Sequence, residues 1–167
     1  MAISSKTSSV SESNGPATTG DGFRYILLAS EGRAFTDAVI ARAEELLSAT
    51  PRARIHVFTI ARVYGSGFGL PNPGLLPTKR EWEGQRKSVA SVIRRLRKDG
   101  IKADGRVIGT RQGMQRICKE AEKEGCDAIV MGADPARSRL MRPFMWSQEP
   151  QRVSRRAKVP VFLVTAE

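Results

Sequence analysis

DAIVMG, at residues 127–132, and YILLA, at residues 25–29, are the two stretches from which the fold of this chain is predicted. Both are almost continuous apolar runs of strand length, which is the pattern of strands that are covered on both faces. The runs RIHVFTI (54–60) and VPVFLVT (159–165) are rich in β-branched and aromatic residues and predict two more strands. A fifth strand, over 102–108, is expected nearer a sheet edge because it carries an aspartate and a glycine.

Helical periodicity lies between these runs. The apolar spacing predicts helices over residues 34–49, 80–99, 113–124 and 148–157. Strands and helices therefore alternate along the chain, and such alternation favours parallel strands joined by right-handed crossovers. We expect an α/β fold: a single doubly wound, five-stranded parallel sheet with helices on both faces, Rossmann-like in architecture.

The composition restricts the classes of function. The chain has 167 residues, the length of one domain, and a net charge of +11 that attracts polyanions. Two cysteines and a single histidine make a disulfide scaffold, a zinc finger and a multi-histidine metal site improbable. Any histidine-dependent nucleophile would have to rely on His56, which lies in an apolar strand and is expected to be a hydrogen-bonded core residue. We predict no catalytic and no metal-binding residue.

The ends and loops of the chain add further expectations. Residues 1–21 are rich in Ser, Thr and Gly and predict a disordered tail, so the folded domain is expected at 22–167. A signal-peptide core and an apolar run of about 18 residues are both missing from the sequence, which favours a cytoplasmic protein without a membrane partner. Gly and Pro in residues 64–79 predict a long loop.

The predicted architecture indicates where a ligand would bind. In doubly wound sheets, ligands bind beyond the carboxyl ends of the strands, where the strand order reverses. The loops after the first and fourth strands are therefore the candidate site. Ser30, Glu31 and Gly32 follow the first strand, and Gly132 and Asp134 follow the fourth.

Three motifs carry a family resemblance. They are ILLASEG at residues 26–32, DAIVMG at 127–132 and AKVPVFLV at 157–164. In this order, and with a short helix between the last two, the chain resembles the universal stress protein family. The resemblance implies a stress-response role without catalysis. It also implies a homodimer, which would form through the closing strand from Val159 to Thr165 and so cover an apolar sheet edge.

The same resemblance implies a nucleotide site, with ATP as the candidate cofactor. Many members of the family bind ATP through the motif G-x2-G-x9-G-[S/T], whose glycines let backbone N–H groups approach phosphates. Here Gly132 keeps the first glycine, but Pro135 replaces the second and has no N–H to donate. Glu31 stands where ATP-binding members carry an aspartate, and Ile60 stands where a side chain packs on the adenine.

The rest of the altered motif contains basic and hydroxyl side chains. Arg137 and Arg139 follow Gly132 closely and could bind phosphate through their guanidinium groups, or could belong to a solvated basic face. The third glycine of the motif and its Ser/Thr fall on Met145 and Trp146 in one register. In the other register they fall on Ser147 and Gln148, of which Ser147 could also be a plain helix cap.

These expectations lead to one leading function and two alternatives. The leading function is a non-enzymatic stress-response dimer that binds a nucleotide or another phosphate ligand at the ends of strands one and four. The charge of the chain keeps a basic nucleic-acid-binding module as an alternative, although no recognition-helix or aromatic-interleaved basic motif supports it. A slow ATPase relying on Glu31 and Asp134 is the other alternative.

The basic helix after the long loop places Arg94, Arg97 and Lys98 away from its apolar face. This placement is typical of an exposed helix surface.

Overall fold

Five parallel strands form a sheet in the order β3-β2-β1-β4-β5 in the computed structural model, which describes residues 22–62, 77–133 and 149–165. Every pair of neighbouring strands is parallel. The elements in chain order are β1 (Tyr25–Ser30), α1 (Asp37–Leu46), β2 (Arg54–Arg62), α2 (Lys79–Lys98), β3 (Lys102–Thr110), α3 (Gly113–Glu124), β4 (Ala128–Ala133), α5 (Glu149–Arg156) and β5 (Val161–Thr165). The predicted α/β architecture is confirmed, with β3 at one edge and β5 at the other.

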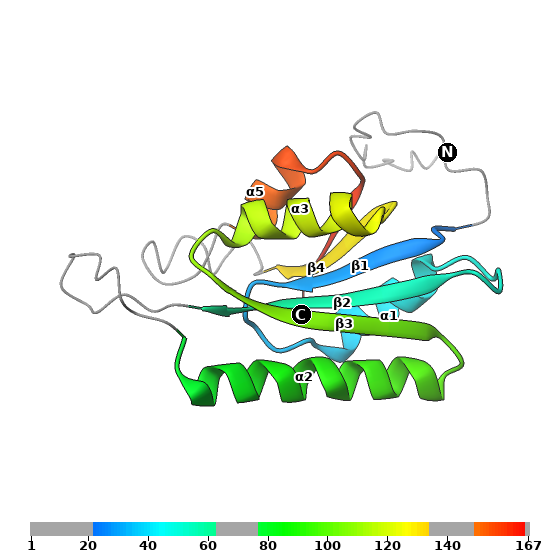
Figure 1. The fold of residues 1–167 in the computed structure, drawn as a ribbon. Coiled ribbons are helices and arrows are strands. Elements are labelled where there is room, and N and C mark those ends of the chain that lie inside the picture. Colours follow the sequence, from blue (N-terminus) through cyan, green and yellow to red (C-terminus); the bar gives the residue numbers. More distant parts are fainter. Residues whose placement is uncertain (1–21, 63–76, 134–148, 166–167) are drawn as a thin grey trace, which may run out of the picture.

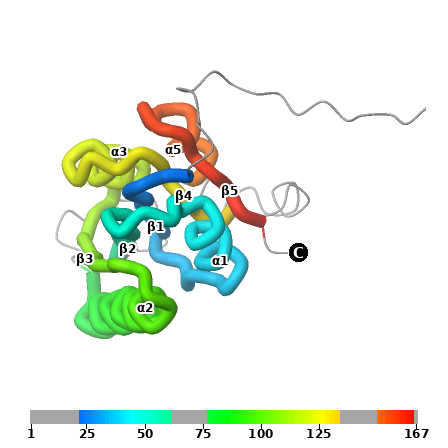
Figure 2. Tube along the Cα trace, turned by 90° about the vertical axis from the view of Figure 1, so that its right-hand side faces the viewer, coloured from blue at the N-terminus to red at the C-terminus, as the bar shows by residue number. Residues whose placement is uncertain are grey.

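Helices cover both faces of the sheet. Figures 1 and 2 show α1 and α2 on one face and α3 and α5 on the other. Successive residues of a strand point to opposite faces, so Ile26 and Leu28 of β1 pack toward α1 and α2, whereas Leu27 and Ala29 pack toward α3 and α5. Each face therefore has its own hydrophobic cluster, and β1 contributes to both, as its uninterrupted apolar sequence predicts.

Several element ends differ from the predicted ones for local reasons. The helix predicted over 34–49 is α1, which begins at Asp37 because the Thr36 side chain caps it, and ends before Leu47, whose backbone is extended. The strand predicted from residue 127 begins at Ala128, because the carboxylate of Asp127 accepts hydrogen bonds from the backbone N–H groups of Arg24 and Tyr25.

The other predicted ends shift by at most two residues. The two strands predicted over 54–60 and 102–108 each extend by two residues, because β2 and β3 stay paired as far as Arg62 and Thr110. The strand predicted over 159–165 begins at Val161, after a proline that cannot donate a ladder hydrogen bond. The predicted tail and most of the predicted loop at 64–79 lie outside the described residues, and α2 begins at Lys79.

Both cysteines are buried thiols. Cys118 packs on the inner side of α3, and Cys126 lies in the turn before β4. Burial raises the pKa of Cys126 to about 12, and nearby Asp127 and Glu124 add to the effect. Burial also raises the pKa of Cys118. Because a thiol with a raised pKa is a poor nucleophile, burial and pKa together assign both residues a packing role.

Candidate functional site

The carboxyl ends of β1 and β4 enclose a small cavity. These two strands are neighbours, although they are first and fourth in the chain, and the strand order reverses between them. The cavity measures about 150 Å³ and lies on the α1 side of the sheet, where Phe35, Val39 and Val164 form its apolar wall. Three predicted site residues, Ser30, Glu31 and Gly132, line it together.

The turn after β1 is held in one shape by side-chain hydrogen bonds. The Ser30 hydroxyl donates to the carbonyl of Arg33 at 2.7 Å and accepts from the N–H of Gly32 at 3.2 Å. Gly32 has a φ of 105°, a backbone conformation that favours glycine. Its carbonyl accepts from Gln85 Nε2 of α2 at 2.9 Å, so the turn is also fixed to the helix behind it. Ser30 therefore lines the cavity, whereas Gly32 lies in the turn beside it without lining it.

Glu31 and Arg33 form an ion pair in the cavity wall. Arg33 Nε lies 2.6 Å from Glu31 Oε1, and the two side chains are 22% and 2% exposed. The pair places a carboxylate and a guanidinium together at the ligand end of β1. Sequence reasoning left Arg33 out of the candidate site. Its signal was its place in the SEGR turn, two residues after the acidic residue.

Gly132 leaves open space at the end of β4. A Cβ atom built on Gly132 would meet only Val39 Cγ2, at 3.4 Å, within 4 Å. Packing in the described part of the chain therefore does not require a glycine here. Because the residue lines the cavity, the missing side chain leaves its backbone accessible from that side.

The other predicted site residues are not brought to this cavity by the described structure. Ile60 is buried on the opposite face of the sheet, in the cluster packed against α3 and α5, because its side chain alternates with that of Thr59. Asp134, Arg137, Arg139, Ser147 and Gln148 lie outside the described residues.

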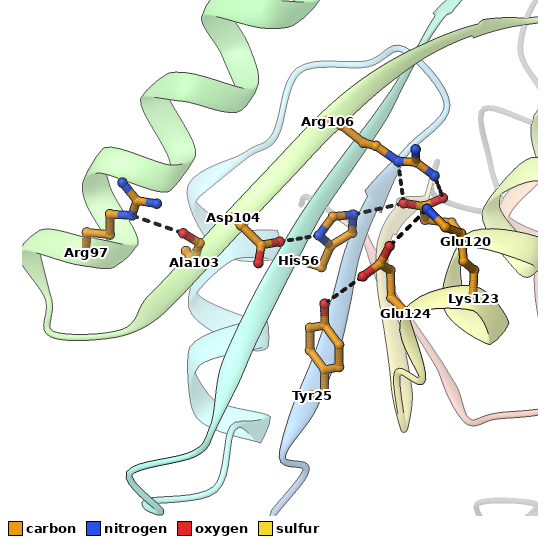
Figure 3. Close-up of polar contacts among 9 residues, drawn as sticks. All are labelled: Tyr25, His56, Arg97, Ala103, Asp104, Arg106, Glu120, Lys123 and Glu124. Atoms are coloured by element: carbon orange, nitrogen blue, oxygen red, sulfur yellow. Dashed lines mark hydrogen bonds and ion pairs between the residues drawn. The ribbon is translucent and has the colours of Figure 1, made fainter.

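A second polar group lies on the α3 face of the sheet (Figure 3). His56 of β2 places its Nδ1 against Asp104 of β3 and its Nε2 3.0 Å from Glu120 Oε1 of α3. Arg106 contacts both oxygens of Glu120, with its Nε 2.7 Å from Oε1. Burial acts to raise the pKa of Glu120, but the hydrogen bonds from Arg106 and His56 outweigh it and lower this pKa overall.

This network contains residue types that bind metals, but its contacts favour ion pairing. Donor atoms of His56, Glu120 and Glu124 lie within 4.8 Å of one another. Glu124 also accepts a hydrogen bond from the Tyr25 hydroxyl at 3.3 Å and pairs with Lys123. Since a guanidinium covers both oxygens of Glu120, the negative charge that a metal ion would need is already balanced. The network joins β2, β3 and α3, and the predicted core role of His56 is confirmed.

Comparisons with known proteins identify the family of this chain. The sequence model of the Universal stress protein family matches residues 22–165. A search among curated proteins found no match. None of the described helices is long and apolar enough to span a bilayer.

Solved structures share the fold at low sequence identity. A universal stress protein family member from Burkholderia pseudomallei is 20% identical, with a TM-score of 0.61 and coverage of 86% of this chain and 96% of that one. The Archaeoglobus fulgidus universal stress protein in complex with dAMP is 17% identical (TM-score 0.54, 83% and 94% covered). An Arabidopsis thaliana family protein with AMP bound is 11% identical (TM-score 0.53, 86% and 91% covered). Because the family match spans nearly the whole chain, the protein belongs to the universal stress protein family.

Proposed function

We propose that this chain is a non-enzymatic stress-response protein that binds an adenine nucleotide or another phosphate-bearing ligand at the carboxyl ends of β1 and β4. One observation carries the proposal: the cavity at the strand-order reversal gathers Ser30, Glu31 and Gly132, which come from distant parts of the chain. The dAMP and AMP complexes of the two relatives support the ligand class.

The cavity supplies several kinds of polar contact. Glu31 can accept from a ligand hydroxyl or amine, and the backbone around Gly132 can approach a ligand closely. Arg33 can bind an anionic oxygen, since guanidinium groups bind phosphate strongly. Pro135 replaces the second motif glycine and has no N–H to donate, so we assign the remaining phosphate contacts to Arg137 and Arg139. Asp134, Ser147 and Gln148 complete the proposed set.

Titration of the purified protein with ATP and AMP by calorimetry tests the ligand class. Gly132→Ala is the sharpest variant, because its new methyl group enters the cavity while clashing with nothing in the described structure. We expect nucleotide affinity to fall at least about tenfold while the melting temperature stays within a few degrees. Ser154→Ala on the exposed side of α5 is the control.

A second variant separates the two parts of the site. Arg137→Ala should reduce the affinity for ATP more than the affinity for adenosine, because only ATP carries the phosphates that the arginine would bind. Absence of nucleotide binding by the wild-type protein would overturn the ligand proposal, and ADP release above background would overturn the non-enzymatic role.

The proposed assembly is a homodimer through β5. This strand lies at a sheet edge, and its residues Val161–Val164 are apolar and half-buried. Pairing with the β5 strand of a second copy would give hydrogen-bond partners to the unpaired backbone groups of this edge, which is otherwise prone to aggregation. Light scattering at micromolar concentration should give a dimer mass, and a monomer would contradict the proposal. We also propose a cytoplasmic location, which fractionation of cells would check.

A further inference from the structure

The outer face of α2 carries a straight stripe of four basic and two small residues. Positions separated by four and then three residues lie on one line along a helix, because their mean spacing is close to one helical turn. The stripe consists of Arg80, Gly84, Lys87, Ser91, Arg94 and Lys98, all exposed. Figure 1 shows α2 as the outermost layer on its side of the sheet, and the exposure of the six residues places the stripe on the solvent side of this helix.

The positive charge of the stripe is not used within the described structure. The α2 helix contains eight basic and two acidic residues, in a chain whose whole net charge is +11. Arg95 of α2 pairs with Asp37, and Arg97 donates to the carbonyl of Ala103. The four basic side chains of the stripe, in contrast, form no ion pair with the residues that the structure describes.

Two features of the stripe are unfavourable for an isolated helix. Gly84 lies within the helix, where glycine costs about 1 kcal/mol relative to alanine, yet a Cβ there would meet nothing within 4 Å. Arg80 lies in the first helical turn, where a positive charge opposes the helix dipole. The missing side chain leaves a shallow hollow between Arg80 and Lys87, which Glu81 and Glu83 also line. Internal packing explains neither feature.

We infer that this stripe is a docking surface for an acidic helix of a partner protein. Helices pack through stripes of residues spaced by three and four, and small residues at the contact allow a close approach. Arg80, Lys87 and Arg94 are separated by about 10.5 Å each along the axis. A partner helix with a carboxylate at every seventh residue repeats at the same distance, so each carboxylate faces a basic side chain while the partner backbone passes over Gly84 and Ser91.

The same stripe fits other anionic partners less well. It has no aromatic side chain on which a base could stack and no amide side chain that could read a base edge. It also has no apolar side chain that could enter a lipid bilayer. Preferential binding of a nucleic acid or of an anionic membrane would therefore contradict the proposal.

The test uses a labelled helical peptide about as long as α2, with glutamates at seven-residue spacing, and a scrambled peptide of identical composition. Fluorescence anisotropy of the full chain should show binding of the first peptide that weakens with added salt, and at least about tenfold weaker binding of the second. The charge-reversal pair Lys87→Glu and Arg94→Glu should reduce affinity at least about tenfold. The control pair Arg155→Glu and Arg156→Glu changes net charge equally on exposed positions of α5 and should leave affinity within about twofold.

Gly84→Leu separates docking from folding. Leucine is a better helix former than glycine, so the melting temperature should rise or stay constant, whereas the bulky side chain should fill the hollow and weaken peptide binding at least about tenfold. Equal weakening by the control pair would overturn the proposal, as would equal binding of both peptides. Tighter binding of a duplex oligonucleotide or of phosphatidylserine vesicles at physiological salt, or no peptide binding at millimolar concentration, would also overturn it.

Discussion

Two buried carboxylates, Glu31 and Glu120, each pair with an arginine, but the pairs have different consequences. Glu31 and Arg33 lie in the same turn, two residues apart, and face the cavity. Glu120 of α3 pairs with Arg106 of β3 and also contacts His56 of β2. The first pair lies within one turn at the cavity, whereas the second joins β2, β3 and α3. We propose that the first pair serves ligand binding, whereas the second stabilises the fold.

Loss of Glu120 should produce the largest effect. Glu120→Ala removes the shared partner of buried His56 and of Arg106, whose side chain is 41% exposed, and losing these charged hydrogen bonds should cost about 2 to 3 kcal/mol in free energy of unfolding. Urea denaturation measures this loss. Glu122→Ala, on the exposed side of the same helix, should cost less than about 1 kcal/mol and is the control. Equal losses would remove the distinction between the two carboxylates.

The stability of the protein at acidic pH should depend on the same carboxylate, Glu120. Because the pKa of Glu120 is lowered in the folded state, its ionised form stabilises the fold above the ordinary glutamate pKa of about 4.3. This contribution is lost as the pH falls through the lowered pKa. The urea midpoint of the wild type should therefore decrease between about pH 5 and pH 3. In Glu120→Gln the decrease should be shallower, and parallel curves would contradict this assignment.

Removal of Arg33 should cost less stability than removal of Glu120. Arg33→Gln leaves the Glu31 carboxylate beside a cavity that water can enter, so we expect a loss of about 1 to 2 kcal/mol. The same variant should weaken nucleotide binding if the guanidinium contacts the ligand. Calorimetry and urea denaturation of the one variant measure both effects. A larger stability loss than that of Glu120→Ala would reverse the comparison.

Asp104 should give the smallest effect. It contacts the same histidine as Glu120, but its side chain is 57% exposed. Asp104→Asn should lower the free energy of unfolding by less than about 1 kcal/mol, since solvent screens an exposed pair. Comparison of its urea midpoint with that of Glu120→Gln separates burial from hydrogen bonding to His56. A loss equal to that of Glu120→Gln would show that exposure does not decide the outcome.

The sequence predicted the fold and part of the site through local patterns. Apolar runs such as YILLA alternate with amphipathic helices, and such runs are typical of parallel strands that are buried on both faces. The strand type and the sheet edges could therefore be predicted. The same logic placed Ser30, Glu31 and Gly132 together, because they follow strands that meet at the reversal of strand order. Element ends were less accurate, since capping by Thr36 and by Asp127 decides them locally.

By itself, then, the sequence determined the alternation of parallel strands and helices, because this depends on periodicity within short segments, and the general location of the cavity followed from the doubly wound architecture. Tertiary structure alone decided which polar groups meet. Glu120 lies 64 residues from His56, and their contact requires α3 to pack across β2 and β3. Arg33 pairs with Glu31 across a turn that hydrogen bonds of Ser30 and Gln85 hold in place. The stripe on α2 could be read from its spacing, but the packing of α2 on the sheet left it exposed.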